Sequence, residues 1–146
     1  MGYIEQNLIT GEKIIYSTKL HWIVFLWPVI FLFLAFIGFV VSAGAGGFFL
    51  FIGVLIGLFS FASYATSEFA VTNKRVLIKV GFIRRHSLEI LLTKVEGIGV
   101  DQDIPGRLLG YGTIVVTGTG GTKETFPNIM APLEFRRRVQ EQITLV

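Results

Sequence analysis

The sequence has no cysteine among its 146 residues and few charged residues. The first absence excludes disulfide frameworks, zinc–thiolate sites, cysteine-ligated iron–sulfur clusters and thiol nucleophiles. Charged residues make up 16% of the chain, against about 25% in an average soluble domain. Because 52% of the residues are hydrophobic, the composition also excludes an intrinsically disordered chain. An ordinary soluble domain is therefore disfavoured.

The missing charges are confined to one stretch. No Asp, Glu, Lys or Arg occurs from Leu20 to Ser67, which is about twice the roughly 20 apolar residues that one membrane-spanning helix needs. The centre of this stretch, residues 42–47, is small and Gly-rich and predicts a tight turn. We therefore expect a hairpin of two transmembrane helices, at about 22–41 and 48–66. A secretory signal is disfavoured, because the first apolar run is longer than a signal h-region.

Basic residues indicate the orientation of this hairpin. Lys13 and Lys19 precede it, the connection between the helices is uncharged, and five basic residues follow soon after it. The positive-inside rule then places both termini in the cytoplasm. Only His21, at the edge of the first span, is ionisable, which disfavours an ion-coupled pump because such proteins need ionisable groups inside the membrane.

Two glycines of the second predicted helix, Gly53 and Gly57, form a GxxxG pattern. Such spacing lets two helix backbones approach closely. We expect these glycines to pack against another helix, which is either the first helix of the same chain or a helix of a second copy.

The remainder of the chain, residues 67–146, holds 11 of the 13 basic and 8 of the 10 acidic residues. Short β-prone and alternating runs predict six strands. A turn is expected at 73–74, a hairpin turn at 118–121 and a loop over 101–112, which contains Pro105 and three glycines. The predicted strands cover 69–72, 75–80, 82–90, 95–100, 113–117 and 122–126.

The C-terminal segment predicts a helix. Pro132 suits a first helical turn, and apolar residues then recur at helical spacing, at Phe135, Val139, Ile143 and Val146. The expected fold class is α+β: a transmembrane hairpin followed by a small β-barrel or curled antiparallel sheet that this helix caps. The chain then divides into a cytoplasmic juxtamembrane segment (1–21), the hairpin (22–66) and a cytoplasmic domain (67–146).

Several short motifs together resemble the bacterial pleckstrin-homology-like (PH-like) family of small membrane proteins. They are Leu8-Ile9-Thr10-Gly11-Glu12, Thr72-Asn73-Lys74-Arg75, Lys94-Val95-Glu96, Gly106-Arg107-Leu108-Leu109-Gly110-Tyr111-Gly112 and Gly118-Thr119-Gly120-Gly121. The resemblance covers about 67–143, and the preceding hairpin fits the usual layout of the family. It implies a PH-type fold, membrane association and no known catalysis. With the orientation predicted above, we expect an integral protein of the cytoplasmic (inner) membrane of a bacterium.

The sequence carries no clear catalytic, metal or cofactor motif. Residues 118–123 read GTGGTK between two predicted strands, whereas a P-loop needs a strand, a loop and a helix. His21 and His86 lack a second ligand at metal-binding spacing. Asp101 and Asp103 could bind a cation or exchange protons, but Asp in such a loop more often caps a turn. We therefore expect no enzyme, no cofactor and no metal.

Four basic residues are the candidate binding site: Lys74, Arg75, Arg84 and Arg85. They follow the second apolar helix closely, so they could contact anionic lipid headgroups. The alternative is a solvated strand face that only enforces membrane topology. Nucleic acid is disfavoured as a partner, because the net charge is only +3 and acidic residues are interspersed.

The function that these observations favour is a membrane-anchored PH-like interaction or scaffold module. We expect it to self-associate into homo-oligomers, to contact membrane lipids and to bind an unidentified membrane or cytoplasmic protein. The alternative is an oligomeric channel or transport assembly in which the hairpins line a pore with a hydrophobic gate.

Overall fold

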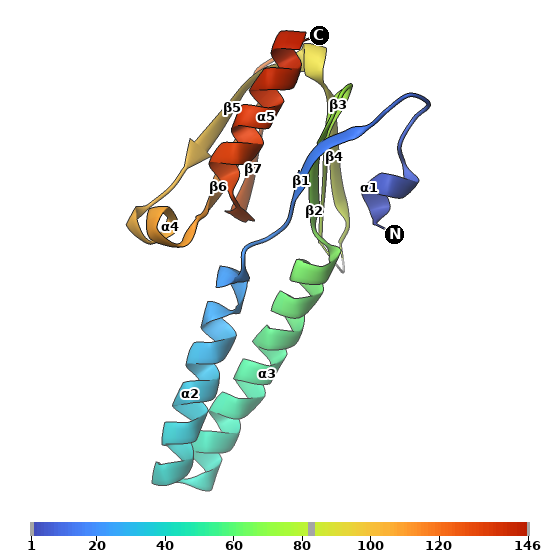
Figure 1. The fold of residues 1–146 in the computed structure, drawn as a ribbon. Coiled ribbons are helices and arrows are strands. Elements are labelled where there is room, and N and C mark those ends of the chain that lie inside the picture. The colour runs from blue at the N-terminus through green and yellow to red at the C-terminus, as the bar shows by residue number, and fades with distance from the viewer. Residues whose placement is uncertain (1, 82–83, 146) are drawn as a thin grey trace. The chain divides into compact units, whose positions relative to one another are not determined.

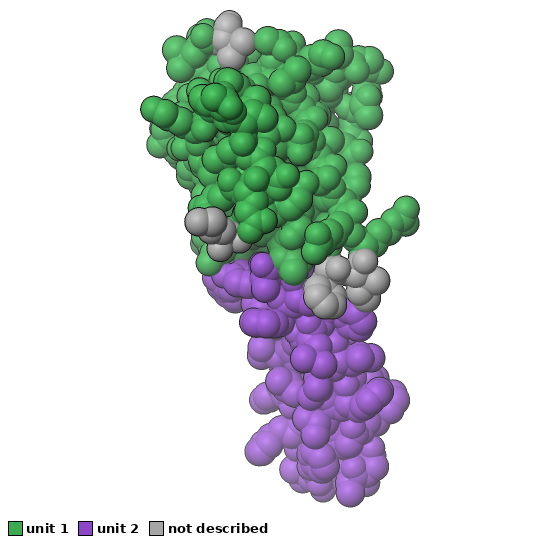
Figure 2. Space-filling model, turned by 90° about the vertical axis from the view of Figure 1, so that its right-hand side faces the viewer, with its two compact units in different colours: residues 1–21, 66–146 green, residues 22–65 purple. Residues whose placement is uncertain are grey.

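The computed structural model describes residues 2–81 and 84–145. The chain forms two compact units, one made of residues 1–21 and 66–146 and the other of residues 22–65 (Figure 2). The predicted strand over 82–90 lies partly outside the described residues, as does Val146 of the C-terminal stripe.

The smaller unit consists of two apolar helices, α2 (Leu26–Val41), preceded by a 3-10 turn η1 (Trp22–Phe25), and α3 (Ala43–Thr66) (Figure 1). Only Ser42 separates them, in an extended conformation, and its Oγ accepts a hydrogen bond from the Ala45 N–H at 3.1 Å. The predicted turn at 42–47 is therefore wrong beyond its first residue. The small residues after Ser42 begin α3 instead, because the side-chain cap on Ser42 starts a helix at once.

Two helical spans, η1 with α2 (Trp22–Val41) and α3 (Ala43–Thr66), are long and apolar enough to cross a membrane, by length and composition. Their buried residues are few and small, namely Pro28, Ala35 and Gly38 on α2 and Gly46 and Gly53 on α3. Large side chains remain exposed, such as Phe36 (73% exposed) and Val40 (80% exposed). The two helices therefore approach each other through small residues and leave their bulky residues outside.

The larger unit begins with a four-stranded antiparallel sheet in the order β1-β2-β3-β4. Its strands are β1 (Ile14–Thr18), β2 (Glu68–Thr72), β3 (Arg75–Val80) and β4 (His86–Leu91). No strand was expected at residues 14–18, although they pair with β2, with Thr18 opposite Phe69. The two apolar helices are thus an insertion between two neighbouring strands. Both connections leave the sheet at the same end, where β1 finishes and β2 starts.

The second sheet is three-stranded and antiparallel, in the order β5-β6-β7. It contains β5 (Val95–Asp101), β6 (Tyr111–Gly118) and β7 (Lys123–Met130) and is followed by the C-terminal helix α5 (Pro132–Leu145). The hairpin turn at 118–121 and the C-terminal helix are confirmed. α5 contacts strands of both sheets and buries Phe135 and Val139 completely, so the core lies between the sheets and this helix.

The strands do not close into a barrel, which corrects one of the two expected arrangements. A short 3-10 segment, η2 (Leu92–Lys94), redirects the chain between β4 and β5. Apart from one bridge between Leu20 and Ile129, no pairing joins the two sheets in the part of the chain that the structure describes. The alternation of apolar residues in the sequence indicates that each strand has a buried face, but not which strands pair. The sequence could therefore not distinguish a closed barrel from two separate sheets.

A short helix, α1 (Tyr3–Gln6), covers the outer face of the first sheet. Leu77 shares a face of β3 with Arg75 and Lys79, whose side chains are polar. Leu77 is nevertheless only 2% exposed, because Ile4 of α1 packs against it and Ala70. The N-terminal segment therefore forms part of the folded unit.

A further helix, α4 (Ile104–Leu109), replaces most of the loop expected over 101–112. The Asp103 carboxylate caps its N-terminus by accepting a hydrogen bond from the Gly106 N–H at 2.9 Å. Gly110 ends it with φ +83°, a left-handed conformation that glycine adopts without strain. The helix has only six residues, and a capping Asp, a proline and a terminal glycine lie in or beside it. This part of the sequence therefore looks like a loop that is rich in turns.

Candidate functional site

The four basic residues of the candidate site do not form one cluster. Lys74 and Arg75 lie at the turn between β2 and β3, whereas Arg84 and Arg85 follow the other end of β3. A strand of this length, six residues, spans about 20 Å. The structure therefore separates them into two pairs at opposite ends of the first sheet.

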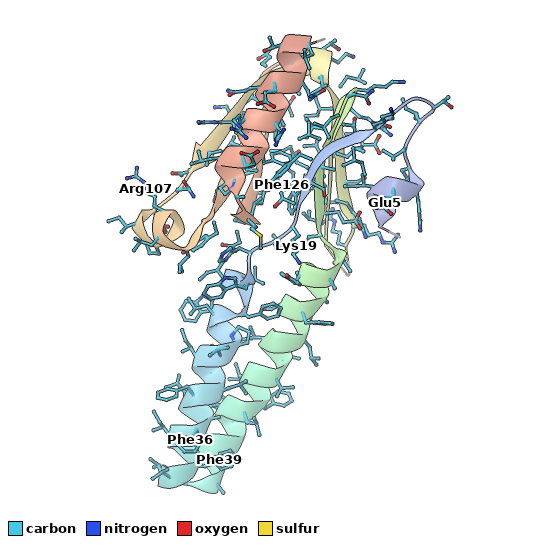
Figure 3. The ribbon with its side chains drawn as sticks, in the orientation of Figure 1. Glu5, Lys19, Phe36, Phe39, Arg107 and Phe126 are labelled. Atoms are coloured by element: carbon cyan, nitrogen blue, oxygen red, sulfur yellow. The ribbon has the colours of Figure 1, made fainter. Side chains whose placement is uncertain are left out.

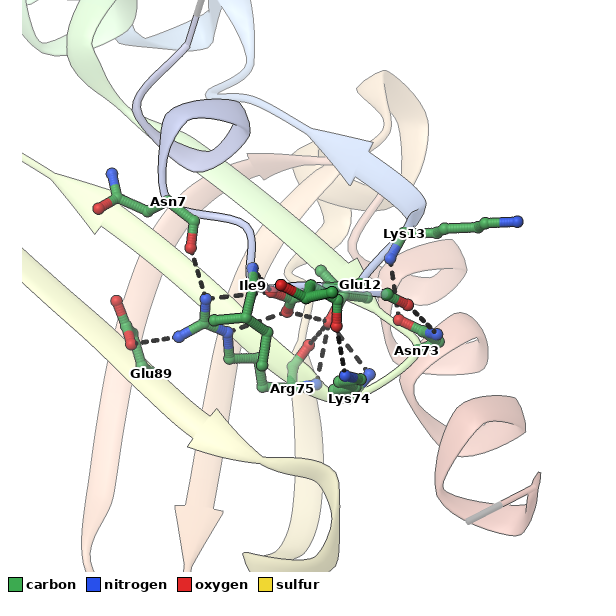
Figure 4. A network of polar contacts seen from close by, with 11 residues as sticks. Asn7, Ile9, Glu12, Lys13, Asn73, Lys74, Arg75 and Glu89 are labelled. Atoms are coloured by element: carbon green, nitrogen blue, oxygen red, sulfur yellow. Dashed lines mark hydrogen bonds and ion pairs between the residues drawn. The ribbon is translucent and has the colours of Figure 1, made fainter.

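Arg75 is held in a polar network under the N-terminal segment (Figure 4). Its Nε donates to Glu12 Oε1 at 2.9 Å, and its Nη2 donates to Glu12 Oε2 at 3.1 Å. Nη1 donates to Glu89 Oε2 at 2.6 Å, and Nη2 also donates to the Asn7 carbonyl at 2.7 Å. The Arg75 side chain is 12% exposed. The guanidinium therefore makes its hydrogen bonds within the protein, which leaves few of its N–H groups to bind a lipid headgroup.

The carboxylate of Glu12 is the centre of this network, and its side chain is fully buried. Burial alone would raise the pKa of Glu12, but hydrogen bonds from Arg75, the Ile9 N–H and the Thr72 hydroxyl outweigh it, so the pKa is lowered. The hydrogen bond to Glu12 correspondingly raises the pKa of Arg75. Both groups are therefore charged at neutral pH.

The adjoining residues connect the same two segments. Asn73 accepts a hydrogen bond from the Lys13 N–H at 2.9 Å and donates one to the Gly11 carbonyl. Lys74 Nζ donates to the Thr10 carbonyl at 2.9 Å. The motifs Leu8–Glu12 and Thr72–Arg75 are thus two halves of one structural element. The sequence does not show that the two motifs pair, because Glu12 and Arg75 are 63 positions apart in the chain.

Arg84 and Arg85 are exposed at the opposite end of β3. Lys79, near the end of that strand, pairs with Glu68, the first residue of β2. The turn that carries the two arginines therefore lies at the end of the sheet where the chain arrives from the apolar helices. Gly81 starts this turn with φ +97°, and a side chain there would collide with the Arg84 carbonyl.

Of the residues considered for catalysis or metal binding, Asp103 and His86 contact other residues of the protein. Asp101 and Asp103 line a small cavity of about 180 Å³, and Asp103 caps α4. His86 Nε2 lies 3.5 Å from Glu124 at an exposed position. Among the described residues, no group of three or more His, Cys, Asp or Glu side chains could hold a metal ion.

Both glycines of the GxxxG pattern face α2 of the same chain. A Cβ placed on Gly53 would lie 3.2 Å from Phe31 Cβ, and one on Gly57 would lie 3.6 Å from Pro28 Cβ. Of the two partners that the sequence left open, the structure places the first helix next to these glycines.

A family model described as the bacterial PH domain matches residues 23–143. The chain belongs to the bacterial PH-domain family. This confirms the resemblance drawn from the sequence motifs, and the match extends through the apolar helices as well as the sheets. A search of curated proteins gave no match.

PH domains are generally non-catalytic interaction modules, and they commonly bind lipids or proteins. In this bacterial PH domain the motif residues Glu12, Arg75 and Gly110 have structural roles, as does Asp103, which lies just before a motif. They connect the N-terminal segment to the first sheet and bound α4. The family motifs therefore identify the fold, and a binding surface must be sought among exposed residues.

Proposed function

We propose that this bacterial PH domain is a membrane-anchored interaction module at the cytoplasmic face of the inner membrane. The observation that carries the proposal is the insertion of two uncharged helices between the neighbouring strands β1 and β2. Because both connections leave one end of the sheet, a hairpin that crosses the bilayer twice would hold that end toward the membrane.

The exposed side chains of the inserted helices support this anchor. Aromatic residues such as Trp27, Phe33 and Phe51 are each more than 60% exposed. In water, each large apolar side chain left unburied forgoes about 1.5–3 kcal/mol, whereas hydrocarbon solvates it favourably. The basic residues on both sides of the hairpin favour cytoplasmic termini.

Arg84 and Arg85 are the proposed contacts with anionic headgroups. They are exposed, and their turn lies at the sheet end that the hairpin would anchor. Arg75 has a structural task instead, and Lys74 lies at the far end of β3. Each basic residue near an anionic surface contributes about 1 kcal/mol, so the pair would orient the domain and not anchor it alone.

Self-association and binding of a protein partner belong to the same proposal. Because Gly53 and Gly57 face α2 of their own chain, an oligomer would use other surfaces. The bulky outer faces of α2 and α3 and the exposed strands of the two sheets are the surfaces left for such contacts.

Extraction of native membranes tests the anchor. Alkaline carbonate releases peripheral proteins and leaves integral ones in the sedimented membrane. We expect the full chain in the membrane pellet and its release only by detergent. Recovery in the carbonate supernatant would contradict the proposal, since a hairpin that spans the bilayer cannot be released without disrupting lipid.

A further inference from the structure

Helix α4 exposes an apolar surface that the fold does not use. Ile104 is 75% exposed, Leu108 is 81% exposed and Leu109 is 44% exposed, so half of its six residues are large and solvent-facing. The same helix carries Arg107, which extends outward from it in Figure 3. No ion pair involves Arg107 among the described residues. Such a surface normally marks a binding site, because exposed apolar side chains rarely cluster without one.

The C-terminus of α4 is attached to the last residue of the folded unit before the apolar helices. His21 is 3% exposed, and its Nε2 donates to the Leu109 carbonyl at 3.0 Å. Its ring lies against Tyr111, with ring centroids 5.3 Å apart. The backbone N–H of His21 donates to the Asn128 carbonyl at 2.8 Å. Three contacts from different elements therefore fix His21, and with it the point where the chain leaves for Trp22.

Chain length then limits how far α4 can lie from that point. Trp22 follows His21 directly and begins the apolar stretch. Consecutive Cα atoms are about 3.8 Å apart, and a helix of six residues is about 9 Å long. Because His21 bridges to Leu109 through one side chain, Ile104 and Leu108 lie within roughly 25 Å of Trp22, the first residue of the candidate membrane span.

We propose that α4 is an interfacial anchor that inserts Ile104 and Leu108 into the boundary between headgroups and acyl chains. Arg107 would extend to the phosphates, as long basic side chains do at interfaces. Charge favours lipid over a second copy of the chain, because Arg107 complements an anionic surface and would repel its own copy, while the Asp103 carboxylate is engaged in capping α4. This inference rests on the proposed membrane anchor and adds a second point of lipid contact.

The chain has no cysteine, so one introduced cysteine carries one label. We would attach an environment-sensitive fluorophore to the full chain at Leu108→Cys and reconstitute it in vesicles that contain anionic lipid. Two matched positions serve as references. Thr119→Cys lies in the exposed turn at the other end of β6, and Phe36→Cys lies on the outer face of α2. Each label is tested for blue-shifted emission and for quenching by lipids that carry a quencher on the upper acyl chain.

The expected result is lipid quenching at positions 36 and 108, at least threefold stronger than at position 119. Quenching at 36 with a water-like signal at 108 would overturn the role of α4 and leave the membrane anchor intact. A blue shift at 108 without lipid quenching would also overturn it, since protein would then cover α4. A water-like signal at 36 would refute the anchor itself and, with it, the tether on which this inference depends.

Discussion

Arg75 Nε lies 2.9 Å from Glu12 Oε1, and this ion pair joins residues on either side of the inserted apolar helices. It connects the segment before the insertion to the sheet that follows it. Burying two charges is costly unless their hydrogen bonds are satisfied, and here Thr72, the Ile9 N–H and Glu89 supply the remaining contacts. The pair therefore closes the folded unit across the insertion.

Removing one partner of this pair is expected to destabilise the folded unit. Glu12→Gln leaves the mostly buried Arg75 guanidinium with only Glu89 as a counter-charge. Breaking such a pair costs about 3 kcal/mol. The measurement is thermal unfolding of the detergent-solubilised full chain.

Two variants sharpen this test. Glu12→Met combined with Arg75→Met removes both charges and is expected to be less destabilised than Glu12→Gln alone. Glu141→Gln alters only exposed ion pairs on α5 and is expected to cost less than about 1 kcal/mol. If Glu12→Gln and Glu141→Gln unfold at the same temperature, the network does not hold the unit together.

The lowered pKa of Glu12 predicts a dependence of stability on pH. An unfolded Glu has a pKa of about 4.3, so the contribution of Glu12 is fully present above that value. It declines as the pH falls further and is lost once the pH passes the lower folded pKa. Melting of the native chain and of Glu12→Gln from pH 7 to pH 3 measures this. The difference between them should stay constant down to about pH 5 and then shrink; a difference that grows on acidification would contradict it.

Sequence reasoning predicted the family, the apolar hairpin, most strands and the C-terminal helix, since each depends on local periodicity or on a motif. It missed strand β1 because residues 14–18 are separated from their partner strand by the whole insertion. It missed helix α1 because that helix has only four residues. It grouped Lys74, Arg75, Arg84 and Arg85 because they are close in sequence. Strand β3 lies between the two pairs and places them at opposite ends of the first sheet. Such pairings depend on contacts between distant residues, which local patterns do not encode.

The packing of α3 on α2 predicts that a large side chain destabilises the protein at one glycine of α3 and not at another. Gly53→Leu would force a side chain against Phe31 and Leu32, whereas nothing lies within 4 Å of a Cβ on Gly44. Overpacking of this kind costs about 1–3 kcal/mol. Thermal unfolding in detergent should therefore show a loss of stability for Gly53→Leu and none for Gly44→Leu. Equal stability would mean that the two helices do not pack through Gly53.

If the turn after β3 contacts lipid headgroups, replacing its two arginines should make the protein lose bound anionic lipid selectively. Arg84→Gln with Arg85→Gln should weaken retention of phosphatidylglycerol about fivefold per residue, which corresponds to about 1 kcal/mol each. Native mass spectrometry of the protein released from mild detergent counts the retained lipids. Lys74→Gln is the matched control, since Lys74 lies at the far end of β3. If Lys74→Gln loses as much lipid as the double variant, the turn has no special role.

The sidedness of the chain in intact cells tests the central claim most directly. Single cysteines at Gly44, between the two apolar helices, and at Thr119, in the β6–β7 turn, would be probed with a membrane-impermeant maleimide on spheroplasts. A membrane-anchored cytoplasmic module predicts that Gly44→Cys is labelled from outside and Thr119→Cys only after permeabilisation. Labelling of Thr119→Cys in intact spheroplasts, or protection of both positions until permeabilisation, would contradict it.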